Sequence, residues 1–191
     1  TGHPLWNPRL RLFLRYEFEN VVISQPRGNL LGVGGDLQNT FSNIFIANAF
    51  RDGITSSLRF TVNWDSRDNR LSTTNGIFAN YAVQVADQYL GSDNTFVRQT
   101  AFARFYKKVL GPVVFKVNTE LGLITSRKQV PVFERFYLGG IRSLRGFDNR
   151  EVGPRDEFGD FIGGETEAFF NFEFIFPLYQ ELNIKGVTFF D

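Results

Sequence analysis

Long segments that alternate apolar and polar residues constrain the fold of this chain most. From Ile54 to Asp65, every second position is apolar except Ser56, and the positions between them carry Thr, Ser, Arg, Asn and Asp. A period of two residues is the pattern of a β-strand with two unlike faces. The pattern is found in the segments 9–19, 54–65, 77–85, 97–107, 113–123, 166–176 and 182–191. It is less regular at 97–107 and 182–191. It predicts an all-β chain of about seven antiparallel strands.

The length and the polar face of these segments favour a transmembrane β-barrel over a soluble β-sandwich. Strands usually have about five or six residues, whereas a tilted strand that crosses a bilayer needs about nine to eleven. The polar face carries charged residues in mid-strand, among them Arg59, Lys116 and Glu173, as the wet lumen of a barrel does. The 23 Phe residues fit a lipid-facing surface. The sandwich is the alternative, and it predicts a chain that folds in water without detergent.

The connections between the segments alternate in length. Those at 20–53 and 124–164 are long, and those at 66–74, 109–112 and 177–181 are short. Outer-membrane barrels have short periplasmic turns and longer extracellular loops, so we expect 124–164 to be a long extracellular loop. Apolar residues at helical spacing predict a short helix from Thr40 to Phe50. Because a closed barrel needs at least about eight strands, about seven strands form only part of one.

Composition gives no support for catalysis or for a metal site. The net charge is +1, there is no Cys, and the only histidine is His3. No window of about 18 apolar residues predicts a transmembrane helix, and no leader opens the chain. Glu165, Glu167 and Glu173 share one strand face, which we interpret as lumen lining rather than as paired catalytic carboxylates. We therefore expect no enzymatic activity, no metal, no cofactor and no nucleic-acid partner.

One segment of the longest connection resembles a known signature. Residues 141–148 read Ile-Arg-Ser-Leu-Arg-Gly-Phe-Asp and are followed by Val-Gly-Pro at 152–154. They resemble the long extracellular loop of the BamA superfamily of outer-membrane proteins, with Arg145-Gly146-Phe147 as the core. Two more segments support the resemblance: residues 133–140, which precede the motif, and the turn at 64–69, which is similar to the family's D-x-R-D-N turn.

The resemblance covers nearly the whole chain. It implies that residues 1–191 are part of one C-terminal transmembrane β-barrel domain, without POTRA domains, and supply about seven of about sixteen strands. In that superfamily the loop folds back into the lumen, where the motif arginine pairs with wall carboxylates. Carried over to this chain, Arg145 pairs with Glu173 and Asp191.

Strand parity places the same two carboxylates on the polar face. Glu173 is opposite in parity to Phe172 and Phe174, and Asp191 is opposite in parity to Phe190. A guanidinium is a planar fork that holds a carboxylate through two hydrogen bonds, which lysine does not reproduce. In a partly wet lumen such a pair fixes the position of the loop more than it adds stability. The alternative is that Arg145 is an ordinary solvated arginine of the loop.

The resemblance also implies a function. It describes a non-enzymatic factor of the bacterial outer membrane that folds and inserts other outer-membrane proteins. Its expected partners are nascent outer-membrane proteins, periplasmic lipoproteins of an assembly complex and the lipid bilayer. A TamA-like translocation subunit and a two-partner secretion pore are alternatives within the superfamily. A passive channel is the alternative from another class, and it requires a lumen that the loop does not plug.

Overall fold

The chain folds into one antiparallel sheet. The computed structural model describes residues 3–4, 7–22, 53–155, 159–179, 181–182 and 184–191. Eight strands pair in sequence order, each with its chain neighbours. They are β1 (His3–Pro4), β2 (Leu10–Val21), β3 (Gly53–Asp65), β4 (Gly76–Ala86), β5 (Phe96–Leu110), β6 (Val113–Thr125), β7 (Thr166–Tyr179) and β8 (Ile184–Phe190), with the 3-10 helices η1 (Gln88–Leu90) and η2 (Val132–Glu134). Among the described residues, no helix has the length and apolar character to cross a membrane.

The prediction of an all-β, antiparallel fold is confirmed, with changes at the strand ends. Because β6 continues to Thr125, the long loop occupies 126–165 rather than 124–164. The last strand begins at Ile184 instead of Leu182. The two-residue β1 was not predicted, because so short a bridge carries no periodicity. The helix expected from Thr40 to Phe50 lies outside the described residues.

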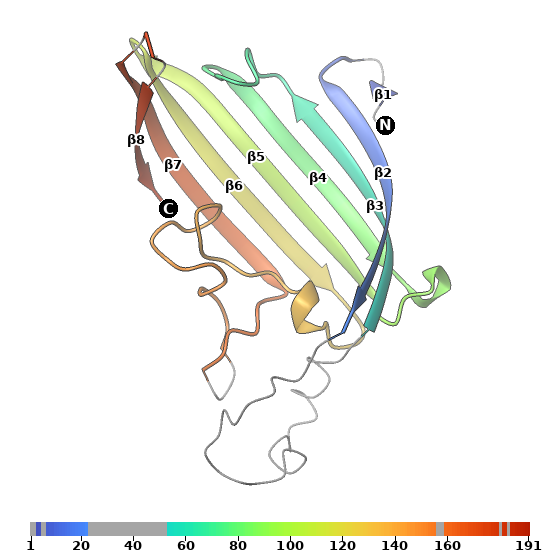
Figure 1. Ribbon diagram of the computed structural model, residues 1–191. Coiled ribbons are helices and arrows are strands. Elements are labelled where there is room, and N and C mark those ends of the chain that lie inside the picture. The colour runs from blue at the N-terminus through green and yellow to red at the C-terminus, as the bar shows by residue number, and fades with distance from the viewer. Residues whose placement is uncertain (1–2, 5–6, 23–52, 156–158, 180, 183) are drawn as a thin grey trace.

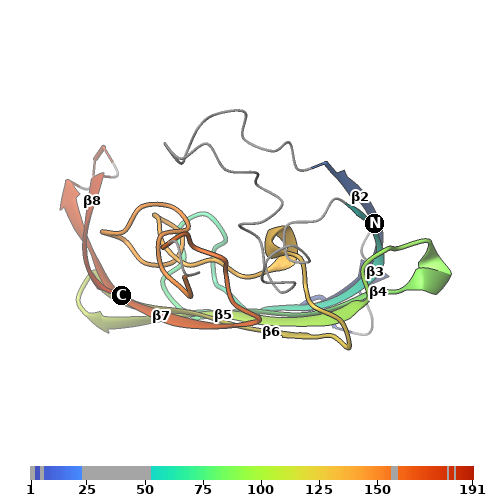
Figure 2. The same cartoon turned by 90° about the horizontal axis from the view of Figure 1, so that it is seen from below.

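The sheet is strongly curved, and the loop that joins β6 to β7 lies against its concave side (Figures 1 and 2). One end of the wall, the short-turn end, carries the β3–β4 turn (66–75) and the β5–β6 turn (Gly111–Pro112). The opposite end, the long-loop end, carries the connection 126–165. Among the described residues β1 and β8 do not pair with each other, so the sheet is open, and its curvature is that expected of part of a barrel wall whose concave side is the lumen side.

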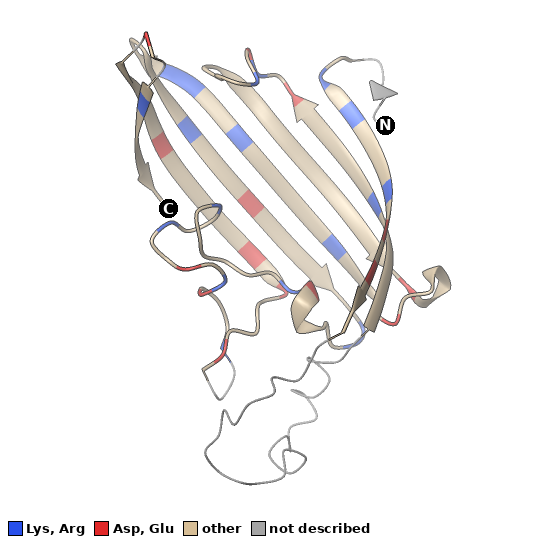
Figure 3. Cartoon of the chain, in the orientation of Figure 1, with Lys and Arg blue, Asp and Glu red and all other residues tan. Residues whose placement is uncertain are grey.

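The two faces of the wall invert the burial pattern of a soluble protein. On the convex face, large apolar side chains are exposed and stack across strands, as where Phe60 lies between Leu14 and Val83. On the concave face, polar side chains such as Gln84 and Asn171 are buried. Charged residues lie along the middle of the strands (Figure 3). An apolar exterior around a polar interior is the arrangement of a wall that faces lipid outside and water inside.

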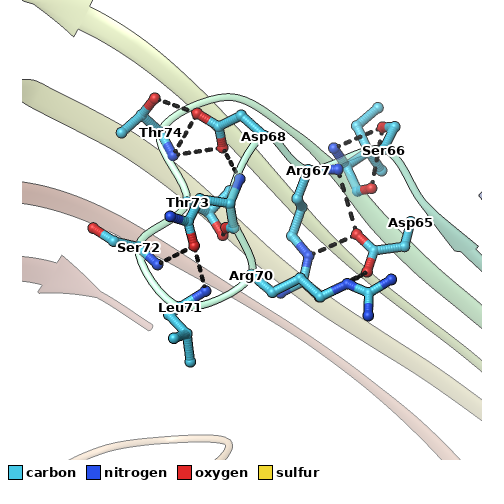
Figure 4. Close-up of polar contacts among 11 residues, drawn as sticks. Asp65, Ser66, Arg67, Asp68, Arg70, Leu71, Ser72, Thr73 and Thr74 are labelled. Carbon is cyan, nitrogen blue, oxygen red and sulfur yellow. Dashed lines mark hydrogen bonds and ion pairs between the residues drawn. The ribbon is translucent and has the colours of Figure 1, made fainter.

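Local hydrogen bonds order the β3–β4 turn (Figure 4). Arg67 donates to Asp65 from Nε at 2.8 Å and from Nη2 at 3.0 Å, and Arg70 lies 3.1 Å from the same carboxylate. Asp68 accepts hydrogen bonds from the hydroxyl and the backbone N–H of Thr74, at 2.5 and 3.0 Å. The turn is therefore a fixed structure at its end of the wall.

Candidate functional site: a loop anchored to the concave wall

Arg145 joins the long loop to the last two strands of the wall. Its Nη1 donates to Glu173 Oε1 at 2.9 Å, and its Nε and Nη2 donate to the two oxygens of Asp191 at 2.8 and 2.5 Å. The guanidinium also stacks on Phe189, with its central carbon 3.7 Å from the ring centroid. The hydrogen bonds to Asp191 and the charge of Glu173 raise the pKa of Arg145 above its ordinary value, so the residue stays charged. We call this set of contacts the Arg145 anchor.

Strand pairing explains why the two carboxylates meet one arginine. In β7 and β8, Phe172 pairs with Phe190, and Glu173 pairs with Phe189. Side chains alternate along a strand, so Asp191 points to the face opposite that of Phe190. This is the concave face, on which Glu173 also lies. The parity of the sequence segments therefore places the carboxylates where the structure has them.

Backbone contacts extend the Arg145 anchor. The backbone N–H of Arg145 donates to Asp191 Oδ2 at 2.8 Å. The side-chain amide of Asn171 donates to the carbonyl of Ser143 at 2.6 Å and accepts from Asn118 at 2.7 Å. Because Asn171 and Asn118 are cross-strand partners, the loop backbone is tied to β6 as well as to β7.

The other two residues of the motif have different roles. Gly146 adopts a φ of 96°, a conformation that L side chains rarely adopt. Phe147 is 56% exposed and does not insert into the wall. Its carbonyl accepts a hydrogen bond from the N–H of Gly140 at 3.0 Å, which closes the tip of the loop. Only Arg145 of the three makes a side-chain contact with the wall within the described residues.

Lys116 of β6 holds the other oxygen of Glu173. Its Nζ lies 2.8 Å from Glu173 Oε2, and both side chains are largely buried. Glu173 is therefore shared between a loop arginine and a wall lysine. Removal of Arg145 leaves Glu173 one cation, whereas within the described residues Asp191 has no other ion-pair partner.

A second anchor, which sequence reasoning missed, lies nearer the start of the loop. Arg98 of β5 donates from Nη2 to Glu134 Oε2 at 2.7 Å and also to the carbonyl of Glu134. Glu134, in η2, is 5% exposed. Arg98 also donates to Gln84 at 3.0 Å, and Gln84 donates to Ser57 at 2.9 Å. This Arg98 anchor extends the polar network of the loop across β5, β4 and β3.

Apolar packing accompanies the Arg98 anchor. Ala86, Phe96, Ile124 and Val130 form a small buried cluster, and Phe136 packs against it. Gly122 of β6 faces the same region: a Cβ placed there would lie 2.6 Å from the ring of Phe136 and 2.8 Å from the side chain of Glu167. The glycine is what allows the loop to approach β6 so closely.

The structure does not assemble the remaining acidic residues into a metal site. Within the part of the chain that the structure describes, no group of three His, Cys, Asp or Glu side chains is arranged to hold a metal ion. Glu167 lies on β7 and Glu165 lies just before it. The N–H of Ile124 donates to the backbone carbonyl of Glu165 at 2.7 Å.

Comparison with known proteins gives a consistent result. The sequence profile of the Omp85 superfamily domain matches residues 1–191. The outer membrane protein assembly factor BamA of Nitratidesulfovibrio vulgaris is 36% identical over 137 residues, which cover 70% of this chain and 17% of that protein. A SAM50-like protein of Schizosaccharomyces pombe is 30% identical over 132 residues, covering 66% of this chain and 28% of that protein. The chain thus spans less than a third of the length of either relative.

A solved structure agrees on the fold. The crystal structure of BamA from Haemophilus ducreyi lacking POTRA domains 1–3 superimposes with a TM-score of 0.64 and 24% sequence identity. The match covers 73% of this chain and 29% of that one. At that identity the likeness concerns the fold alone, and it supports a curved sheet that forms part of a barrel wall.

Proposed function

Because the chain belongs to the Omp85 superfamily, we propose that it forms part of a factor that folds and inserts other β-barrels into the outer membrane. The observation that carries the proposal is the long loop held against the concave wall by Arg145, Glu173 and Asp191. The names of the relatives, an outer membrane protein assembly factor and a SAM50-like protein, support the same function. In this proposal the Arg145 anchor fixes the loop and carries out no chemistry.

The finer expectations belong to this proposal. Residues 1–191 form part of a single C-terminal barrel domain, whose long-loop end faces the cell exterior and whose short-turn end faces the periplasm. The compartment is the bacterial outer membrane. The partners are nascent outer-membrane proteins, periplasmic lipoproteins of an assembly complex and the surrounding lipid. The protein works without a nucleotide, a metal or a cofactor.

The lumen-side loop argues against a passive channel. A channel needs an open lumen, whereas here Arg145 and Glu134 hold the loop against the concave face. Two anchors on different strands keep the loop there more firmly than one contact would. The proposed barrel therefore has an obstructed lumen.

The test uses the full-length protein in liposomes, with an unfolded outer-membrane protein added from the outside. We expect faster folding of the added protein than in empty liposomes, and no large steady current in planar bilayers. Arg145→Ala should slow the folding of the added protein, whereas Arg142→Ala, at an exposed position of the same loop, should leave it unchanged. Large steady currents together with no acceleration of folding would contradict the proposal and favour the channel.

A further inference from the structure

A cavity rich in basic residues lies at the short-turn end of the wall, away from the loop. Its volume is about 480 Å³. The β3–β4 turn forms one side, and β5, β6, β7 and β8 form the others. Figure 3 shows Lys and Arg bands on β5, β6 and β8 toward this end. Six cationic residues line the cavity: Arg67, Arg70, Arg104, Lys108, Lys116 and Lys185.

The carboxylates nearby neutralise only part of this charge. Asp65 is shared between Arg67 and Arg70. Glu173 is shared between Lys116 and the loop residue Arg145. Two carboxylates thus contact three of the six lining cations, and one of the two also compensates an arginine from elsewhere.

The other three cations form no ion pair with a carboxylate of the described chain. Arg104 donates to the amide oxygen of Asn118 at 3.3 Å and lies over the Phe102 ring. Lys185 donates to the hydroxyl of Ser72 at 2.7 Å. For the side chain of Lys108 the described residues supply no partner. Several like charges around one partly enclosed space raise its potential and attract anions.

The cavity is held in shape before any ligand arrives. Lys185 and Ser72 are 113 positions apart in sequence, and their hydrogen bond ties the β3–β4 turn to β8 across the concave side. Within the turn, the contacts from Thr74 to Asp68 fix the backbone (Figure 4). A site whose side chains are already ordered loses less entropy when it binds a ligand.

We propose that this cavity binds a multiply charged oxyanion of the phosphate class. Arginine forks and lysine ammonium groups are the side chains that bind phosphate oxygens. The cations approach from the turn and from three strands, so they suit an anion with several charged oxygens. A single carboxylate would leave most of them uncompensated. The ligand is either a free phosphate compound or the headgroup of an anionic lipid.

The cavity and the Arg145 anchor share one residue. Lys116 lines the cavity and also lies 2.8 Å from Glu173. An anion in the cavity competes with Glu173 for Lys116, which leaves Glu173 more fully available to Arg145. By linkage, an occupied cavity then stabilises the docked loop, and a docked loop favours anion binding to the same extent.

The experiment measures binding of inorganic pyrophosphate to the full-length protein in detergent by calorimetry at low ionic strength. We expect binding that weakens steeply with added salt and falls about tenfold or more in the double variant Lys108→Gln, Lys185→Gln, because hydrogen bonds to charged groups are lost. Both lysines are exposed, so the variant should fold. The matched control is Lys107→Gln, the adjacent residue of β5, which has the opposite strand parity and should leave binding unchanged.

The same protein in lipid nanodiscs identifies the source of the anion. If the natural ligand is a headgroup, nanodiscs with an anionic phospholipid should block pyrophosphate binding, and zwitterionic nanodiscs should not. If it is a free phosphate compound, both nanodiscs should bind pyrophosphate equally. The proposal is overturned if the wild-type protein does not bind pyrophosphate at low salt. It is also overturned if Lys107→Gln weakens binding as much as the double variant does. Neither result bears on the insertion of other barrels.

Discussion

Replacement of Arg145 by lysine should loosen the loop although the charge is kept. The guanidinium donates three hydrogen bonds to two carboxylates, and a single ammonium cannot reach all three acceptors in that arrangement. A hydrogen bond to a charged group contributes about 1.5–3 kcal/mol. With two such bonds lost and the arginine side chain 20% exposed, solvent screening reduces the cost to about 2 kcal/mol. That value corresponds to a roughly 30-fold increase in loop opening.

Amide hydrogen exchange of the full-length protein in detergent measures this opening. The reporters are the N–H groups of Gly140 and Ser143, which bond to the carbonyls of Phe147 and Gly140. Their exchange should accelerate roughly 30-fold in Arg145→Lys, as the free energy above implies. Arg142→Lys is the matched control, because Arg142 is exposed and makes no side-chain bond to a described residue. Exchange within about twofold of wild type in Arg145→Lys would refute the assignment of Arg145 as an anchor.

Four further predictions concern the loop and the turn. Glu134→Gln should destabilise loop docking by about 3 kcal/mol, because it leaves Arg98 buried without its counter-charge, and exchange at the N–H of Phe136 should report it. Gly122→Ala should cost about 1–3 kcal/mol in denaturant unfolding, because the new Cβ overlaps the Phe136 ring. Gly146→Ala should cost about 1–2 kcal/mol by the same measurement through backbone strain alone, since its Cβ meets no atom. Hydrogen bonds from Thr74 hold the pKa of Asp68 below its usual range. These bonds should therefore contribute fully to stability above pH 3.8, and their contribution should be lost as the pH falls below that value and Asp68 becomes protonated. Carboxyl NMR titration measures this pKa.

The wall and one of the two anchors could be predicted from sequence because both depend on strand parity. A period of two fixes which face each side chain occupies, whatever the curvature of the sheet. Glu173 and Asp191 could therefore be assigned to one face, and the resemblance of the loop motif then supplied Arg145 as their partner. Strand ends were less accurate, since β5 and β7 continue past the last regular alternation.

The Arg98 anchor could not be found in the same way. Arg98 and Glu134 are 36 positions apart, and one of them lies in a loop that has no repeating pattern. The segment from Val97 to Lys107 was also among the least regular. Nothing in the sequence indicated the partner of Arg98. The contact of Lys185 with Ser72 was missed for the same reason, because it depends on how far the sheet curves.

The two anchors make the loop a chord across the arc of the wall. One end of the chord is fixed on β5 through Arg98, and the other is fixed on β7 and beyond β8 through Glu173 and Asp191. If the arc flattens, its ends move apart and the chord is stretched; if the arc tightens, the chord slackens. The loop therefore resists flattening of the wall, which would widen the barrel, and release of either anchor should make the wall easier to flatten.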